Sequence, residues 1–310
     1  MDYKCKSPVV FIIFNRPDVT KKTFDIIKKV KPNNFIIISD GPRQHLENEL
    51  HLVQKCRNIV SAVDWECNVV KIYSEINMGC MKRIVTGLND VFRTFDKAVV
   101  IEDDCVPTVT FFKFMDWGLE TFENKHNIGM ISGSNLCSNE YEIEYKNGYS
   151  RFINIWGWSC WKRTWLEHNT FLSIYEVNNN LYSILKKYNF KFWQFLYWKE
   201  LLKFTIYKGS TWDFQLQYTF FKKDLLSVYP KYNLINNQGF DGSSTHTNID
   251  TPNYVTKNNA IERDENFDYE TDNTFKYSRT RDNFLASTIW NYNYFSMLKL
   301  FIKNIIRFTF

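Results

Sequence analysis

The segment KAVVIEDD, residues 97–104, joins a short apolar run to three consecutive acids. The apolar residues are largely β-branched, which is typical of a strand covered on both faces of a sheet. Carboxylates placed side by side repel one another, and each raises the pKa of its neighbours unless a cation compensates the charge. No Lys or Arg stands beside Glu102, Asp103 and Asp104 in the sequence, so one interpretation is a site for a hard divalent cation. A solvated turn after the strand is the alternative.

Similar apolar segments alternate with stretches of helical spacing along the first half of the chain. This order predicts an α/β fold with a mostly parallel central sheet covered by helices. Ligands of such sheets bind at the carboxyl ends of the strands. We therefore expect the polar residues at the strand ends to share one crevice. Further strands are expected at residues 9–14, 35–39, 68–75 and 128–134, and helices near residues 24–30, 45–63, 83–95 and 111–122. The polar residues are Asn15, Arg16, Asp40, Glu75, Asn77 and the acids at 102–104.

The composition is that of an ordinary globular protein and argues against several classes. Of the 310 residues, 44% are hydrophobic and 24% charged, and the net charge of +5 is too small to indicate a nucleic-acid partner. The seven cysteines include no C-x-x-C pair, which argues against a disulfide framework or a zinc site. The apolar run near the N-terminus is too short for a signal peptide, and no run is long enough to span a bilayer. We expect a cytoplasmic protein.

The second half of the chain is less regular and richer in aromatic residues, which suit contact with carbohydrate or with a membrane surface. Residues 186–208 carry six lysines and one acid, and residues 248–283 are predicted to be polar surface loops. The C-terminal residues 291–310 predict a basic amphipathic helix that lies on an anionic membrane. An ordinary helix packed on the domain is the alternative. The apolar positions of this helix are Leu298, Phe301, Ile302, Ile305 and Ile306.

Four blocks of the sequence resemble a known family. PVVFIIFNRPD, IIISDGPR, NMGCMKRIVTGLNDVF and VVIEDD occur in the order and spacing of nucleotide-diphospho-sugar transferases with the GT-A fold. The chain most resembles bacterial surface-polysaccharide glycosyltransferases related to the N-acetylglucosaminyltransferase I family, in which Glu-Asp-Asp replaces the commoner Asp-x-Asp. The resemblance covers residues 8–247 and implies one GT-A domain over residues 1–290, followed by the helix at 291–310. Within that domain, residues 1–135 would bind the nucleotide sugar, 136–247 would carry the acceptor and catalytic groups, and 248–290 would form loops.

The resemblance also implies roles for the residues at the strand ends. Asp104 would bind Mn²⁺ or Mg²⁺, Asp103 would lie near the ribose, and Glu102 near the donor sugar. Asn15 and Arg16 would lie beside the nucleotide, and Asp40 would accept a hydrogen bond from uracil. Arg83, or the adjacent Lys82, would add positive charge near the diphosphate, although a solvated helix start explains both equally well.

Three further segments resemble parts of the family's catalytic half. GSTWDFQLQ contains Asp213, which the resemblance implies is the catalytic base; helix capping is the alternative role for an Asp at this position. NNQGFDGSSTHT ends in His246, which would complete the metal site or bind a phosphate, unless it is simply solvated. Trp156, Trp158 and Trp212 would line the acceptor site, with a place in the core as the alternative.

These inferences predict a metal-dependent inverting glycosyltransferase of bacterial surface-polysaccharide synthesis. It would move N-acetylglucosamine or another hexose from a UDP-sugar to a hydroxyl of a lipid-linked or cell-surface glycan, on the inner face of the cytoplasmic membrane. Residues 169–208 match nothing in the family's eukaryotic member, so the resemblance does not identify the acceptor. A nucleotidyltransferase of similar fold is one alternative, although FNRPD lacks the Gly-rich phosphate loop such enzymes need after the first strand. A non-catalytic glycan- or membrane-binding protein is the other, and the presence of both Asp104 and Asp213 argues against it.

Overall fold

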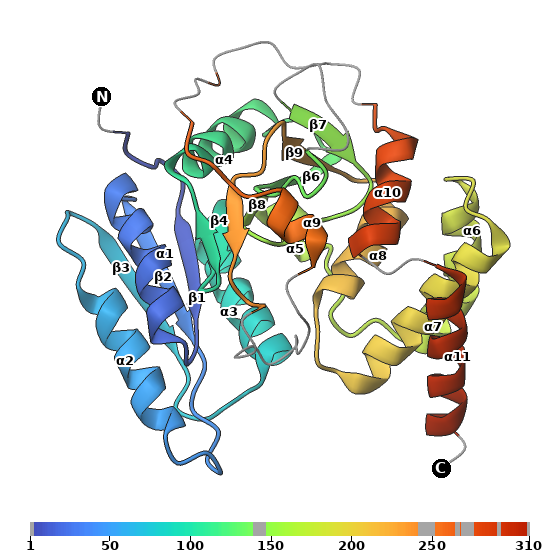
Figure 1. Cartoon of the computed structure of the whole chain (residues 1–310), viewed down its shortest axis with the longest axis horizontal. Helices are drawn as coiled ribbons and strands as arrows, with labels where there is room; N and C mark the ends of the chain where they lie inside the picture. Colours follow the sequence, from blue (N-terminus) through green and yellow to red (C-terminus); the bar gives the residue numbers. More distant parts are fainter. Residues whose placement is uncertain are drawn as a thin grey trace.

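The computed structural model describes residues 3–138, 147–240, 252–263, 267, 276–289 and 293–308. An eight-stranded sheet runs through the protein in the order β3-β2-β1-β4-β8-β6-β9-β7 (Figure 1). Its strands are β1 (Val9–Ile13), β2 (Asn34–Ser39), β3 (Asn68–Tyr73), β4 (Lys97–Glu102), β6 (Ile128–Ser132), β7 (Asn147–Ser150), β8 (Trp158–Trp161) and β9 (Leu226–Pro230). The short strands β5 (Cys105–Pro107) and β10 (Ile235–Asn237) form a separate antiparallel pair.

The predicted fold class is confirmed, because the central sheet is mostly parallel and helices cover it. Strands β3, β2, β1 and β4 are parallel neighbours, as are β6 and β9. Strand β8 runs antiparallel to both β4 and β6, and the edge strand β7 runs antiparallel to β9. Each strand expected in the first half is present at nearly the predicted residues, since continuous apolar runs of this length form buried strands.

Each buried strand sends alternate side chains to the two faces of the sheet, and each face has its own hydrophobic core. On one face, Phe11, Phe35 and Val99 pack with helices α1 (Pro17–Val30), α2 (Glu49–Ser61) and α4 (Val109–Thr121). On the other face, Val10 and Ile36 pack with α3 (Cys80–Thr94), α5 (Lys162–Leu166) and α8 (Asp213–Lys223). This two-sided burial is why the strands are apolar throughout instead of alternating with polar residues.

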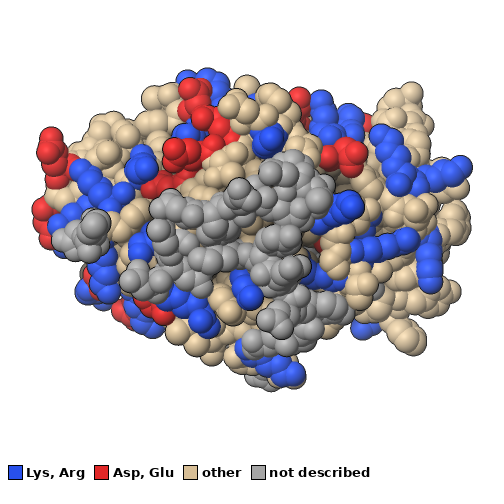
Figure 2. Space-filling model, turned by 90° about the horizontal axis from the view of Figure 1, so that it is seen from above, with Lys and Arg blue, Asp and Glu red and all other residues tan. Residues whose placement is uncertain are grey.

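Residues 169–208 form most of a helical lobe beside the sheet. Helices α6 (Ile174–Lys186) and α7 (Phe192–Lys208) come from this segment, and α11 (Tyr294–Phe308) packs against α7 (Figure 1). The lobe has a third core, which includes the fully buried Trp198 and reaches Met297 of α11. Lys and Arg side chains gather at this end of the molecule (Figure 2).

The prediction of surface loops at residues 248–283 is wrong for residues 253–257 and 279–283, which are helical. The structure forms α9 (Asn253–Lys257) and α10 (Arg279–Ile289) here, and Arg281 and Asp282 are buried. Asp282 accepts hydrogen bonds from the Ser150 hydroxyl at 2.6 Å and from Arg151 Nε at 3.1 Å. Charged residues can be buried when they are paired in this way, and composition alone does not reveal the pairing.

Candidate functional site

The site begins where the connections of the sheet change direction. The chain passes from β1 to β2 and β3 on one side, whereas β4 lies on the other side of β1. Ile12 of β1 is in register with Glu102 of β4, so the loops that follow these two parallel strands leave the sheet side by side. Such switch points are where open α/β sheets bind ligands.

Arg16 supplies a counter-charge that the sequence alone did not reveal. Its guanidinium forms an ion pair with Asp103 and lies 3.1 Å from Asp104 Oδ2. The backbone N–H of Phe14 also donates to Asp103, at 3.3 Å. In the sequence, no Lys or Arg stands beside these acids, and the metal site was predicted for that reason. In the folded protein Arg16 stands beside two of them, because β1 and β4 are neighbours.

The pKa values of Glu102 and Asp103 are nevertheless raised. Burial raises the pKa of Glu102 to about 8, and the carboxylates of Asp104 and Asp103 act in the same direction. Burial also raises the pKa of Asp103 to about 6, against the opposing effect of Arg16. The charge of Asp213 contributes to the raised pKa of Glu102, so Asp213 and the acids at the end of β4 lie in one electrostatic environment.

Asp40, predicted to contact uracil, holds the loop that precedes α3. Its carboxylate accepts from the backbone N–H groups of Gly41 and Met78 at 2.9 Å and of Gly79 at 3.0 Å. Asn77 Nδ2 donates to the same carboxylate at 3.1 Å. A Cβ on Gly41 would lie 2.5 Å from the Ile76 carbonyl carbon, so only glycine allows this approach.

Asn15 is tied to two residues that sequence reasoning missed. Its side-chain amide donates to Glu49 Oε1 at 2.8 Å, and Arg43 Nε donates to the same oxygen at 3.0 Å. Glu49 is buried although it begins a helix with several exposed residues. The available signal was Arg43, which follows β2 just after the predicted Asp40.

A cavity of about 460 Å³, here called the strand-end cavity, opens among these loops. Arg83 of α3 lines it with only 6% of its surface exposed, and its Nε has no hydrogen-bond partner among the described residues. Burial lowers the pKa of Arg83. Arg83 Nη1 donates to Met78 Sδ at 3.6 Å, and a thioether sulfur is a weak acceptor. An anionic ligand in the cavity would give this guanidinium a stronger acceptor. The lining includes Phe14, Asn15, Arg16, Asp40, Arg43, residues 77–84, Glu102, Asp103 and Ser210.

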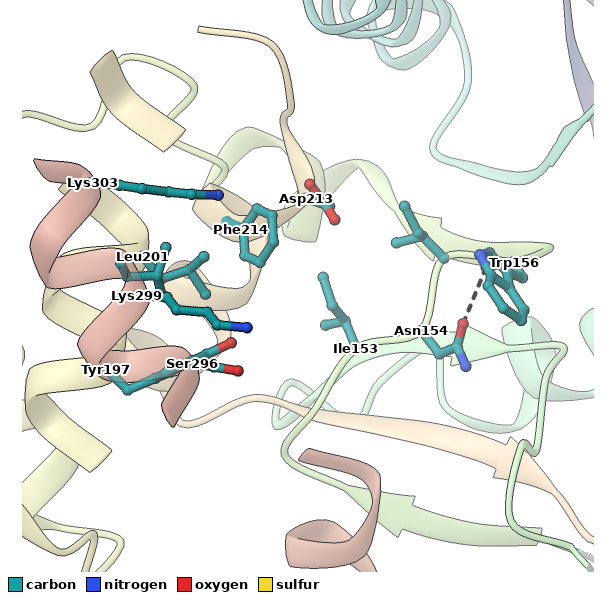
Figure 3. A pocket seen from close by; sticks show the side chains of 12 residues that line it. Ile153, Asn154, Trp156, Tyr197, Leu201, Asp213, Phe214, Ser296, Lys299 and Lys303 are labelled. Carbon is teal, nitrogen blue, oxygen red and sulfur yellow. Dashed lines mark hydrogen bonds between the residues drawn. The ribbon is translucent and has the colours of Figure 1, made fainter. Parts of the chain in front are cut away.

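A second cavity of about 470 Å³, here called the lobe cavity, lies between the helical lobe and residues 153–156 (Figure 3). Asp213 stands at its edge and is half-buried. Residues 209–213 connect the two cavities, since Ser210 lines the strand-end cavity and Asp213 lines the lobe cavity. Asp213 therefore lies in the lobe cavity at the end of the segment that joins the two cavities.

The alternative role of Asp213 as a helix cap is not the one observed. The N-cap of α8 is Trp212, no side chain caps the helix, and Asp213 is the first helical residue. The Thr211 hydroxyl donates to the Asp213 carboxylate. This contact orients the carboxylate without consuming all of its acceptor capacity.

The structure separates the three tryptophans predicted to line an acceptor site. Trp156 lines the lobe cavity, and its backbone N–H donates to Asn154 Oδ1 at 3.3 Å (Figure 3). Trp158 and Trp212 are 1% and 2% exposed and pack against each other with ring centroids 5.6 Å apart. These two belong to the core, so only Trp156 can touch a ligand in the cavity.

The acids at the end of β4 could hold a metal ion only if a nucleotide supplied further ligands. Within the described ranges, no three His, Cys, Asp or Glu side chains are grouped to hold an ion, and His246 lies outside the described residues. Asp104 is half-buried and approached closely by the backbone of Gly239. Mg²⁺ often binds through one or two carboxylates together with phosphate oxygens and water. The residues fit that nucleotide-bridged mode and do not fit an all-protein site.

Comparison with known proteins leaves the family open. No family model matches the chain, and no curated protein matches it. Among solved structures, UDP-glucose pyrophosphorylase with UDP-glucose is 9% identical, with 52% of this chain and 78% of that one covered and a TM-score of 0.32. The 4-diphosphocytidyl-2C-methyl-D-erythritol synthase of Anaerococcus prevotii is 11% identical, with coverages of 74% and 92% and a TM-score of 0.34. Apo UDP-glucose pyrophosphorylase is 9% identical, with coverages of 73% and 93% and a TM-score of 0.36. Likenesses this low carry no argument about activity.

Proposed function

We propose that this protein is a glycosyltransferase that binds a UDP-sugar in the strand-end cavity and transfers the sugar, with inversion, to an acceptor hydroxyl in the lobe cavity. The observation that carries the proposal is Arg83, a buried guanidinium beside a cavity of about 460 Å³, whose Nε has no hydrogen-bond partner among the described residues. Arg16, Glu102 and Asp103 also line that cavity. A further acid, Asp213, lines the neighbouring cavity.

The donor would lie with its diphosphate near Arg83. Guanidinium groups form strong, directional hydrogen bonds with phosphate oxygens, and the low exposure of Arg83 strengthens the attraction by excluding water. Asn15 and Asp40 would bound the nucleotide side of the cavity, although both already hold protein partners. The sugar, which we take to be N-acetylglucosamine or another hexose, would then extend toward Glu102 and Ser210.

Asp213 would act as the general base. A carboxylate at the junction of the two cavities can accept the proton of an acceptor hydroxyl as that oxygen attacks the anomeric carbon. The bond from this carbon to the leaving diphosphate oxygen breaks on the opposite side, which inverts the configuration. Thr211 keeps the Asp213 carboxylate in place through its hydroxyl.

Asp104 would hold Mn²⁺ or Mg²⁺ together with the diphosphate oxygens. Such an ion, when bound, stabilises negative charge that develops on the leaving nucleotide. Arg16 lies 3.1 Å from the same carboxylate and would fix its orientation. The ion would bind the diphosphate oxygens near Asp104, and Arg83 would bind the remaining phosphate oxygens.

The acceptor would be a glycan linked to a lipid at the inner face of the cytoplasmic membrane. Helix α11 carries exposed apolar residues on one side, with Leu298 38%, Phe301 48% and Ile302 55% exposed. Together with the nearby lysines, such a surface suits the headgroup region of an anionic membrane. In the described part of the chain, no helix is both long enough and apolar enough to cross a membrane.

Nucleotidyl transfer is the second candidate, because a nucleoside triphosphate would also find Arg16 and Arg83 in the strand-end cavity. Enzymes of that kind wrap the triphosphate in a Gly-rich backbone loop, and residues 14–18 after β1, FNRPD, contain no glycine. This difference favours sugar transfer.

Product analysis separates the two reactions. The protein is incubated with Mn²⁺ and UDP-N-acetylglucosamine, without acceptor, and separately with UTP and a sugar 1-phosphate. We expect slow release of UDP in the first reaction and no pyrophosphate in the second. Pyrophosphate release without any UDP release would contradict the proposal and favour nucleotidyl transfer.

A further inference from the structure

Two lysines of the C-terminal helix point into the lobe cavity. Lys299 and Lys303 line the wall formed by α11, and Figure 3 shows both side chains directed toward the side on which Asp213 lies. Neither lysine has an ion-pair partner among the described residues. Lys303 Nζ lies 6.0 Å from the Phe204 ring centroid. The two ammonium groups therefore face the space of the cavity, where an anion would neutralise them.

The remainder of the cavity wall is largely apolar. Leu201 and Tyr197 contribute from α7, Phe214 from α8, Leu300 from α11 and Ile153 from the opposite loop. A small free anion would leave these surfaces in contact with water. A ligand that joins an anionic group to an apolar one would bury them, at a gain of roughly 25 cal/mol per Å² of apolar area.

Helix α11 presents three different sides, because successive residues in a helix are about 100° apart. Ser296, Lys299 and Lys303 face the cavity, whereas Met297 and Asn304 are buried against the lobe. The exposed Leu298, Phe301 and Ile302 occupy the side away from the cavity. The helix is only about 10 Å thick, so a membrane in contact with its outer side would lie close to the cavity.

We propose that the lobe cavity binds the phosphate of a lipid-linked acceptor through Lys299 and Lys303, with the first part of the lipid chain against the apolar wall. This inference rests on the proposed function, because it assigns the acceptor's class for the same site. The phosphate would anchor the acceptor on α11, and the sugar attached to that phosphate would reach across the cavity toward Asp213. The C-terminal helix then selects the acceptor and is more than a membrane contact.

Binding of simple probes tests the proposal directly. Dodecyl phosphate and dodecyl maltoside, each below its critical micelle concentration, and inorganic phosphate are titrated while tryptophan fluorescence is followed, since Trp156 lines the cavity. We expect dodecyl phosphate to bind at least tenfold more tightly than either of the other two probes. Equal binding of the maltoside would overturn the phosphate role, and equal binding of inorganic phosphate would overturn the lipid role.

Paired variants assign the binding to the two lysines. The double change Lys299→Gln and Lys303→Gln should weaken dodecyl phosphate binding on the order of tenfold or more. Lys299→Arg with Lys303→Arg should retain binding, which guards against loss of folding as the cause. The control Lys186→Gln with Lys187→Gln removes the same charge from exposed positions outside the cavity and should change nothing. Unaltered binding in the Lys299 and Lys303 glutamine variant would overturn the proposal.

UDP binding, measured on the same proteins, keeps the two proposals apart. We expect UDP affinity to be equal in the wild type and in the Lys299 and Lys303 variants, because neither residue lines the strand-end cavity. If UDP failed to bind while dodecyl phosphate bound through the lysines, the proposed glycosyl transfer would be wrong and the anionic lipid site would stand. If UDP bound and dodecyl phosphate affinity were the same in the wild type and in the Lys299 and Lys303 glutamine variant, only the present inference would fail.

Discussion

The two cavities differ in how their charged groups are satisfied. In the strand-end cavity, Arg16 pairs with Asp103 and Asp104, and Arg43 pairs with Glu49. Arg83 is the exception there, since its Nε has no hydrogen-bond partner within the described residues. In the lobe cavity, Lys299 and Lys303 have no ion-pair partner in the described part of the chain. The first is built from loops at the ends of paired strands and is largely preorganised. The lobe cavity is built from the sides of helices. Substitution of a few helix-surface residues can therefore change which ligand it binds without affecting the sheet.

The largest expected effect tests the residue between the cavities. Asp213→Asn should lower sugar transfer on the order of a thousandfold, because general base catalysis contributes about 10²–10⁴-fold, while UDP affinity stays unchanged. Steady-state transfer rates and UDP titrations measure the two quantities. Asp224→Asn, at the other end of the same helix, is the matched control and should keep its activity. Near-normal transfer by the Asp213 variant would remove it as the base.

A smaller effect concerns His168, which packs against Trp212 next to Asp213. Burial lowers the pKa of His168 to about 4. The unfolded chain, with a His pKa near 6.5, takes up a proton between about pH 6.5 and 4 while the folded protein does not. Stability should therefore be complete above pH 6.5 and fall by up to about 3 kcal/mol as the pH drops to 4.

Thermal unfolding of the wild type and of His168→Gln between pH 4 and 7 measures this contribution. The variant should lose that part of the pH dependence, whereas His126→Gln, at an exposed site, should retain it. Identical pH profiles for the wild type and His168→Gln would contradict the assignment. Loss of this pH dependence in His168→Gln would show that the aromatic packing beside Asp213 keeps His168 uncharged in the folded protein.

The next effect tests the metal at the end of β4. UDP binding by the wild type in Mn²⁺ should weaken on the order of a hundredfold when EDTA is added, since an ion bridging to phosphate contributes several kcal/mol. Asp104→Asn should bind UDP weakly with or without EDTA. Asp25→Asn, which removes an exposed acid of α1, should behave like the wild type. If EDTA left the UDP affinity of the wild type unchanged, the metal would have no role in UDP binding.

The smallest effect separates binding from stability in the strand-end cavity. Arg83→Met should weaken UDP binding by about tenfold yet raise the free energy of unfolding by about 1 kcal/mol, because an unpaired buried charge is removed. Calorimetric titration and urea unfolding give the two values. Arg93→Met, at an exposed ion-paired position of the same helix, should leave UDP binding intact. A loss of both stability and binding would indicate a structural role instead.

The strand-end cavity was largely predictable, because parallel strands bring polar residues from distant parts of the sequence to one edge of the sheet. The sequence could not reveal which of these residues would satisfy one another. Arg16 neutralises acids nearly ninety positions away, and Asp40 is occupied by the backbone of the loop before α3. Both contacts depend on strand order, which periodicity does not specify.

The lobe cavity was not predictable from the sequence, apart from Asp213 and Trp156. Lys299, Leu201 and Phe214 come from three helices, and only the packing of α11 on α7 brings them together. Aromatic residues were also ambiguous, since Trp156 lines the cavity while Trp158 lies in the core two residues later. Strand alternation would place residues two apart on the same face, but Trp156 precedes β8 and Gly157, with a φ of +60°, turns the chain between the two tryptophans.

Residues 209–213 have one further consequence. This short connector leaves α7, passes the wall of one cavity at Ser210 and ends at Asp213 in the other, with the buried Trp212 as its fixed point. A small tilt of α7 would rotate residues 209–213 about Trp212, so that Ser210 and Asp213 would move together. A ligand in either cavity should therefore alter the affinity of the other cavity through this connector, in addition to any direct contact between the two ligands.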